Sequence, residues 1–203
     1  MSAAFLSVLL LVLGGAPGLT PDEGTRTIAE LSARNAGIRS YTFDLHVHIV
    51  VHMFPEVRFG LDGQGEYRRP SQFFVRFKKV PWFGKSFERI NLGPLDPTTW
   101  PKQYTITVAQ HDGDVTVLSM RDRVKSNLTE ARATIDARDG LRQLVWLYNY
   151  GGRIQLDVRP REVSGFPLPE AEDASIKMPN VSASAHADFT NYRVEVDEAA
   201  NAP

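Results

Sequence analysis

Three histidines stand close together on one short stretch of this chain. His46, His48 and His52 are separated by even intervals, and Asp44 precedes them in the same phase. Side chains two residues apart on a β-strand share one face and lie roughly 7 Å apart, a spacing that metal sites use. A complete site also needs a ligand from another strand. Polar residues of these types also occur on the solvent-facing side of any half-buried strand, whether or not a metal binds there. These histidines are the candidate ligands of a metal-dependent hydrolase, but we expect neither a metal nor another cofactor.

The residues present give little support for other kinds of catalytic site. The chain has no cysteine, which excludes a cysteine nucleophile, a cysteine-ligated metal and a disulfide framework. It also lacks the Gly-x-Ser-x-Gly motif that presents a serine nucleophile. Paired carboxylates such as Asp112 and Asp114, or Glu170, Glu172 and Asp173, fall in expected turns, where charges are commonly solvated. We therefore expect a protein that is not an enzyme, and its net charge of -1 gives no reason to expect nucleic acid as a partner.

The histidines lie within a long alternation of apolar and polar residues. From Tyr41 to Met53 every second residue is apolar, which predicts one β-strand with an apolar and a polar face. Pro55 ends this strand, and the runs 57–67 and 73–77 place further aromatic residues at the same spacing. Three consecutive strands of this kind predict an antiparallel meander with a large apolar surface.

Most of the remaining chain also predicts strands. These are 85–92, a hairpin at 103–120, then 127–136, 141–149, 153–159, a short strand 174–178 and a last strand 181–196. Residues 141–150 could form a helix, but Asp139-Gly140 and Gly151-Gly152 are turn dipeptides at hairpin spacing and favour strands. The segment 93–101 holds three prolines and is expected to form no regular element. The fold class is therefore mainly β, a curved antiparallel sheet of about ten or eleven strands.

The N-terminal region predicts an export signal followed by one helix. Residues 5–13 are apolar but too few to span a bilayer of ~30 Å, and small residues precede a cut after Gly18. An uncleaved anchor or a misassigned start is the alternative, because no Lys or Arg precedes the apolar run. A single apolar stripe predicts a covering helix over 21–36. We expect a signal peptide at 1–18, one domain at 19–198 and a disordered tail at 199–203, in a periplasmic or secreted protein.

Two stretches of small residues suggest unfilled volume on the apolar face. One side of 129–135 carries Ala131 and Ala133, and one side of the last strand carries Ala183, Ala185 and Ala187. Small side chains beside large aromatic ones leave apolar volume that an acyl chain can occupy. Alternatively, the helix expected at 21–36 packs there and fills the space.

Four motifs resemble one known family. They are SYTFDLHV at 40–47, GQGEYRRPSQFFVRF at 63–77, ATIDARDGLRQLVWLY at 133–148 and GFPLP at 165–169. With the helix before them, they resemble the LolA-like family of periplasmic lipoprotein carriers and lipoprotein-sorting proteins. The resemblance implies an antiparallel half-barrel of eleven strands whose concave face is covered by helices and shields lipid chains. This chain departs from the family in its lid. The family's carrier has lid helices inserted in the middle of the chain, whereas here the segments that could cover the concave face are the helix 21–36 and the loops 80–84 and 93–101.

The resemblance also implies a site and partners. Lipid or the acyl chains of a lipidated protein would lie against Tyr41, Phe43, Leu45, Val47, Phe59, Phe73, Val75 and Phe77. Arg69, before Pro70, would hold a lid through hydrogen bonds to its backbone, and Trp82, Phe83 and Trp100 would be mobile aromatics at the rim. The partners would be membrane-associated donor and acceptor proteins, with the carrier a monomer. The alternative function is a regulatory or sensory domain of the same fold that binds a protein partner.

Overall fold

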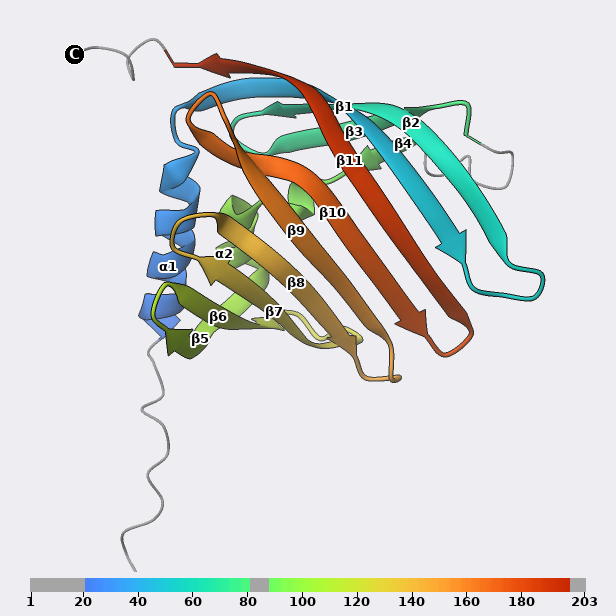
Figure 1. Ribbon diagram of the computed structural model, residues 1–203. Helices are drawn as coiled ribbons and strands as arrows, with labels where there is room; N and C mark the ends of the chain where they lie inside the picture. The colour runs from blue at the N-terminus through green and yellow to red at the C-terminus, as the bar shows by residue number, and fades with distance from the viewer. Residues whose placement is uncertain (1–20, 81–87, 198–203) are drawn as a thin grey trace, which may run out of the picture.

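The computed structural model describes residues 21–80 and 88–197 (Figure 1). The expected signal at 1–18 and the expected tail at 199–203 lie outside these ranges. The described chain begins with α1 (Pro21–Arg34) and then forms strands. The strands are β1 (Ile38–Val51), β2 (Val57–Arg68), β3 (Gln72–Lys78), β4 (Arg89–Asn91), β5 (Tyr104–Asp112), β6 (Val115–Asp122), β7 (Leu128–Asp136), β8 (Gly140–Tyr148), β9 (Arg153–Val163), β10 (Phe166–Met178) and β11 (Val181–Val196).

All these strands belong to one antiparallel sheet in the order β4-β3-β2-β1-β11-β10-β9-β8-β7-β6-β5. The sheet curls into a half-barrel that does not close (Figure 1). Its centre is the pairing of the first and last strands, where Leu45 lies opposite Phe189 and Val47 opposite Ala187. Because β4 and β5 are the two edges, the segment between them must cross from one edge of the sheet to the other. The prediction of ten or eleven curved antiparallel strands with an N-terminal helix is confirmed.

The helix covers only one arm of the sheet. Ile28 and Leu31, from its apolar stripe, pack with Ile106 of β5 in a buried cluster that also contains Ala131 and Ala133 of β7. We call this cluster the helix-side core; its members are Ile28, Leu31, Trp100, Ile106, Val108, Leu118, Met120, Ala131, Ala133, Ile135 and Leu144. The small residues of β7 therefore leave no open volume. This agrees with the alternative interpretation of 129–135, in which the helix packs there and fills the space. The helix ends at Arg34, two residues before the expected end, where the Arg34 guanidinium donates to the backbone oxygens of Asp136 and Ala137.

A second cluster lies on the other arm. We call it the aromatic core; its buried members are Phe43, Leu45, Leu61, Val75, Phe77 and Phe189. Tyr41, Val47, Phe59 and Phe73 pack against it while remaining partly exposed. These residues come from β1, β2, β3 and β11, so pairing of the first and last strands is required to assemble the cluster.

Two predictions about proline-rich segments were wrong. The segment 93–101 forms short helical turns, η2 (Gly93–Leu95), η3 (Pro97–Thr99) and the start of α2 (Trp100–Gln103), each with a proline in its first turn. Proline is tolerated there because the first N–H groups of a helix have no partner within it. Strand β10 begins at Phe166 rather than at 174, and it includes Pro169 next to a register shift. A break in the ladder is where a strand can accept a residue without an N–H group.

Candidate functional site

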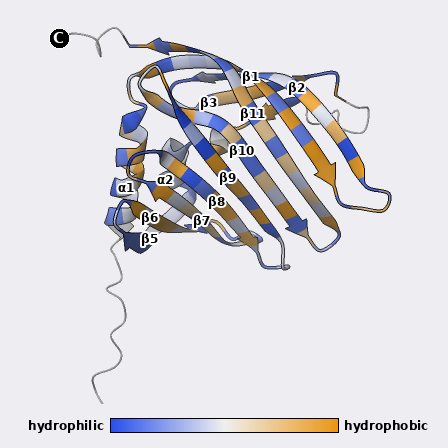
Figure 2. Ribbon diagram, in the orientation of Figure 1, coloured by the Kyte–Doolittle hydropathy of each residue, from blue (hydrophilic) through white to orange (hydrophobic). Residues whose placement is uncertain are grey.

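One row of apolar side chains crosses almost the whole concave face. In ladder order it runs Val108, Leu118, Ala133, Leu144, Leu156, Ala174, Ala185, Ile49 and Phe59. Its first members belong to the helix-side core, which identifies the face, because α1 packs there. Figure 2 shows hydrophobic and hydrophilic residues alternating along β1, β2 and β11, as expected of strands with one apolar and one polar face.

The two ends of this row differ in exposure. Leu118 and Ala133, under the helix, have an exposed fraction of 0%. From β9 to β2 the same row is only half-buried, as is the next row, which includes Ile154, Ile176 and Val51. We call this region the open concave surface; its members are Ile49, Val51, Phe59, Ile154, Leu156, Ala174, Ile176, Ala183 and Ala185. Among the described residues, the elements that cover the helix-side core do not bury it.

The residues expected to contact lipid do come together. All eight belong to the aromatic core or pack against it. Phe43 and Val75 are 3% and 1% exposed, so they form the floor of the site rather than its contact surface. Tyr41 stacks on Tyr67 with ring centroids 4.9 Å apart, and Phe43 lies 5.3 Å from Phe189.

Phe189 and Tyr192 were missed from the sequence. Phe189 continues the alternation of Ala183, Ala185 and Ala187 and could have been found from it. Tyr192 breaks that alternation, because Asn191 adopts a φ of 53° where the β1–β11 register shifts. The Asn191 amide donates to Asp44 Oδ2 at 2.9 Å. This irregularity turns the Tyr192 ring towards Phe43, 5.5 Å away, and periodicity cannot predict it.

Two glycines of β2 let aromatic rings lie against the backbone. A Cβ at Gly65 would lie 1.9 Å from Phe43 Cζ, and a Cβ at Gly63 would lie 2.8 Å from Phe77 Cδ1. Real Cβ contacts this short do not occur, so the two rings occupy the space that side chains at these positions would need. The aromatic core therefore depends on glycine at these two positions of β2 as well as on the phenylalanines of β1 and β3.

One carboxyl group lies on the concave face itself. Glu172 was expected in a turn, which was wrong, because β10 begins at Phe166 and includes it. It is paired with Val158 on one side and Ala187 on the other, in the same row as Val47. Burial raises its pKa from 4.5 to about 7. No side chain of the described residues forms a hydrogen bond or ion pair with it. Its negative charge contributes, after burial, to raising the pKa of Tyr41 and Tyr192.

A second acidic group lies between η2 and η3. Asp96 is 8% exposed, and its Oδ1 accepts hydrogen bonds from the Thr98 backbone N–H at 2.9 Å and hydroxyl at 2.7 Å. Its Oδ2 is buried without a hydrogen-bond partner. Its charge contributes, after burial, to raising the pKa of Tyr41 and Tyr67. The Tyr41 hydroxyl thus lies within electrostatic reach of two carboxyl groups.

The residues expected at the lid and rim lie elsewhere. Trp100 is 2% exposed in the helix-side core, because the turn η3–α2 packs against α1 and β5, so the expectation of a mobile rim residue was wrong. The Arg69 guanidinium donates to Asp197 Oδ2 at 2.8 Å rather than to a lid backbone in the described chain. That pair joins the end of β2 to the end of β11. Trp82 and Phe83 lie outside the described residues.

The histidines lie on the opposite, convex face and are engaged separately. His46 Nδ1 lies 2.7 Å from Asp62 Oδ1, and His52 Nδ1 lies 3.2 Å from Glu56 Oε2. His48 is exposed opposite Gly60. Within 21–80 and 88–197, no group of three or more His, Asp or Glu side chains has an arrangement that could hold a metal ion.

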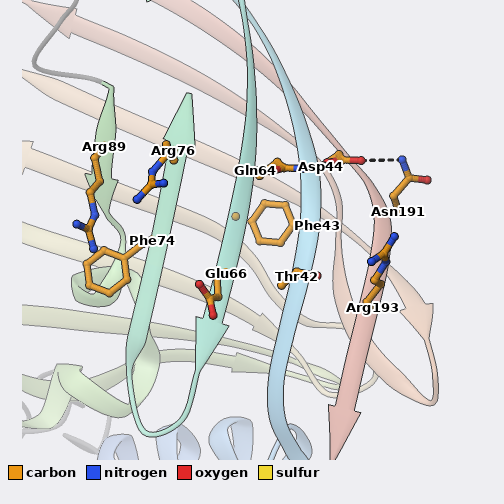
Figure 3. Close-up of a pocket in the computed structure, with 11 residues that line it drawn as sticks. Thr42, Phe43, Asp44, Gln64, Glu66, Phe74, Arg76, Arg89, Asn191 and Arg193 are labelled. Carbon is orange, nitrogen blue, oxygen red and sulfur yellow. Dashed lines mark hydrogen bonds between the residues drawn. The ribbon is translucent and has the colours of Figure 1, made fainter. Parts of the chain in front are cut away.

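The convex face also carries a shallow hollow of about 410 Å³ (Figure 3). Arg76 and Arg89 enter it from neighbouring strands, with the Arg89 guanidinium 4.8 Å from the centre of the Phe74 ring. On the other side, Asp44 accepts hydrogen bonds from Gln64 and Asn191, which hold its pKa below the ordinary range. The hollow is polar and charged, so it does not match an apolar ligand. No described helix is long and apolar enough to cross a bilayer.

Comparisons with known proteins identify the fold. No protein-family model and no curated protein matches the sequence. A solved LolA superfamily protein from Nitrosomonas europaea superimposes with a TM-score of 0.62 at 7% identity, covering 87% of this chain and 96% of that chain. A domain named for outer membrane lipoprotein sorting, from Vibrio parahaemolyticus, gives a TM-score of 0.63 at 10% identity, with 89% and 96% covered. A DUF1329 family protein from Desulfovibrio piger gives 0.62 at 8% identity, with 90% and 99% covered.

These similarities extend over nearly the whole described chain and over nearly the whole of each solved structure. At 7% to 10% identity they establish architecture. The resemblance inferred from the sequence motifs is thus confirmed in the structure, and this chain has the LolA-like fold.

Proposed function

We propose that this protein is a non-catalytic carrier, periplasmic or secreted, that holds acyl chains of a lipid or lipidated protein against the open concave surface. The observation that carries the proposal is the half-buried apolar region from β9 to β2, beside a helix that packs on the other arm. The protein acts as a monomer that receives cargo from one membrane-associated protein and passes it to another. The names of two neighbours, a LolA superfamily protein and a lipoprotein-sorting domain, support the same class of cargo.

The energetic argument concerns exposed hydrocarbon. Each CH₂ group transferred from water to an apolar surface stabilises the bound state by ~0.8 kcal/mol. A carrier therefore needs a face that is apolar and still accessible, and Ile49, Phe59 and Ala185 meet both conditions. Phe43 and Val75 meet only the first, since they are already buried. Cargo would thus contact the open concave surface, which includes Phe59, and the partly exposed residues Val47, Tyr41 and Phe73 beside it.

The test uses two neighbouring residues that face opposite ways on β1. Ile49 is apolar on the concave face and His48 is exposed on the convex face. Native mass spectrometry of the purified protein, followed by lipid extraction, should show a co-purifying lipid near one equivalent. Ile49→Glu should lose that lipid and the uptake of a fluorescent fatty-acyl probe, while His48→Glu should retain both.

Two outcomes would overturn the proposal. One is a folded wild-type protein that carries no lipid and takes up none when it is offered. The other is an Ile49→Glu variant that binds as well as His48→Glu does. Either result would favour the alternative function, in which the concave face binds a protein partner.

A further inference from the structure

The exposed large apolar side chains of residues 21–80 and 88–197 all lie at one end of the half-barrel. In an antiparallel sheet the hairpin turns alternate between the two ends of the strands. One end is formed by the turns 52–56, 123–127, 149–152 and 179–180, which follow one edge of the curved sheet in Figure 1. In or beside these turns are the residues that we call the apolar tips, which are Met53, Phe54, Val124, Tyr150 and Val181. The opposite end has no such residue in the part of the chain that the structure describes.

Charge divides between the two ends in the same way. The four turns with the apolar tips, taken with two strand residues on each side, have two acidic residues, Glu56 and Asp122, and a larger basic set, Arg58, Arg121, Arg123, Lys125, Arg153 and Lys177. The four hairpin turns of the opposite end, taken in the same way, have the basic residues Arg68, Arg69 and Arg138 and a larger acidic set, Asp112, Asp114, Asp136, Asp139 and Glu162. Because the whole chain has a net charge of -1, its positive charge is concentrated beside the apolar tips.

Two of these basic residues face each other without an acidic partner. Arg153 lies directly opposite Lys177 on the β9–β10 ladder, next to the turns 149–152 and 179–180. Like charges in this position destabilise a sheet. The Arg153 guanidinium donates to Gln155 Oε1 at 2.8 Å, and neither Arg153 nor Lys177 forms an ion pair with any described residue. Both line a hollow of about 300 Å³ with Gln155 and Ser175, where an anionic group would relieve their repulsion.

The apolar tips also continue the open concave surface. Met53 follows Val51 at a spacing of two residues, and Val181 precedes Ala183 at the same spacing. Val51 lies opposite Ala183 in the ladder between β1 and β11. The open concave surface therefore reaches the end of the half-barrel that carries the tips.

We propose that this end of the half-barrel docks on an anionic lipid bilayer, with the apolar tips in the interface and Lys125, Arg153 and Lys177 against the headgroups. Binding to a membrane surface grows with the apolar area that it buries and with attraction between basic side chains and anionic lipids. Both features occur together at this end of the sheet and at neither edge of the opposite end. The inference rests on the proposed carrier function and adds the place where cargo enters, because docking puts the open concave surface next to the bilayer.

Vesicle flotation tests the docking. It uses the mature protein that the expected cut after Gly18 produces, so the apolar run 5–13 cannot itself bind lipid. One set of vesicles is phosphatidylcholine alone, and in the other about a third of the lipid is phosphatidylglycerol. Wild-type protein should partition at least about tenfold more strongly onto the anionic vesicles. Phe54→Ser/Val124→Ser should weaken that partition at least about tenfold. Phe54 is completely exposed and Val124 is 78% exposed, so this variant should fold as the wild type does.

Two charge variants are matched between the two ends. Arg153→Gln/Lys177→Gln should weaken partition onto the anionic vesicles about tenfold and leave partition onto neutral vesicles unchanged. Arg68→Gln/Arg138→Gln removes the same charge from exposed side chains of the opposite end. It should stay within about twofold of wild type, because charges farther from the bilayer than a Debye length are screened.

Three outcomes would overturn the docking. They are equal partition of the wild type onto both kinds of vesicle, full partition of Phe54→Ser/Val124→Ser, and a dimer in analytical ultracentrifugation that this variant abolishes, which would assign the tips to a second copy of the chain. Uptake of the fluorescent acyl probe from solution should be unchanged in Phe54→Ser/Val124→Ser. Lost flotation with intact probe uptake would therefore remove the docking alone, whereas a wild-type protein that binds no probe would remove the carrier function.

Discussion

Adding one methyl group to β2 should disturb the aromatic core more than any surface change on that strand. In Gly65→Ala the new Cβ would lie 1.9 Å from Phe43 Cζ and 2.4 Å from Cε1 and Cε2. An ordinary carbon contact is about 3.5 Å, so the ring must withdraw by about 1.5 Å. It has little room to do so, because Phe73, Phe189 and Tyr192 surround it with centroids at 6.0, 5.3 and 5.5 Å.

The expected cost follows from overpacking. Forcing an extra carbon into a close-packed core typically costs 1–3 kcal/mol, and the shortness of this contact places Gly65→Ala at about 2–3 kcal/mol. The assay is urea unfolding followed by circular dichroism, with the unfolding free energy taken by linear extrapolation. Gly60→Ala is the control on the same strand. Its Cβ would meet nothing closer than His46 Cε1 at 3.6 Å, so its unfolding free energy should stay within about 0.5 kcal/mol of wild type.

A double-mutant cycle identifies the cause. Phe43→Leu removes the ring atoms that meet the new methyl group, so the combined variant Gly65→Ala/Phe43→Leu should be more stable than the sum of the single effects predicts. We expect a coupling energy of at least about 1 kcal/mol in that direction. Equal losses in Gly65→Ala and Gly60→Ala, or strictly additive effects with Phe43→Leu, would refute the packing of Phe43 on the backbone of β2.

Two further predictions use the same unfolding assay. The native pKa of Glu172 is about 7 against an ordinary 4.5, so the native state holds this proton more tightly than the unfolded chain. Wild-type stability should therefore fall as pH rises from about 4.5 to about 7, by at most about 3 kcal/mol. Glu172→Gln should remove that part of the slope, and a slope equal to wild type would contradict it. Arg69→Leu breaks an exposed ion pair with Asp197, so it should cost no more than about 1 kcal/mol and leave acyl-probe uptake unchanged. Lost or uncontrolled uptake in that variant would restore a lid role for Arg69.

Much of the fold could be predicted because its signals are local. The alternation from Tyr41 to Met53 spans one strand, and a shift of one residue would turn its whole apolar set to solvent. The dipeptides Asp139-Gly140 and Gly151-Gly152 mark turns correctly, since Gly140 and Gly151 have φ of 82° and 84°. The helix was found from its apolar stripe. Each of these patterns depends on neighbours within a few residues.

Besides the two proline-rich segments, the predictions that failed concern contacts between distant segments. The family resemblance implied that Trp100 is a rim residue, yet its side chain is buried in the helix-side core with Ile28 and Leu31 of α1. Ala131 and Ala133 could not be distinguished from Ala183 and Ala185 by type or spacing. Only the packing of the helix-side core, which joins them with Ile28, Leu31 and Trp100, shows that the first pair is covered.

By itself, the sequence determined the mainly β class, the run of hairpins, the helix and the apolar face of β1, β2 and β3, because period and turn chemistry act over short distances. Only the tertiary structure decided that β1 pairs with β11, which brings Phe189 and Tyr192 to Phe43. It also decided that Glu172 lies in the same row as Val47 and Ala187 on the concave face. These outcomes depend on register and on chain segments that meet across more than a hundred residues, such as Leu45 and Phe189, and no local pattern encodes such a meeting.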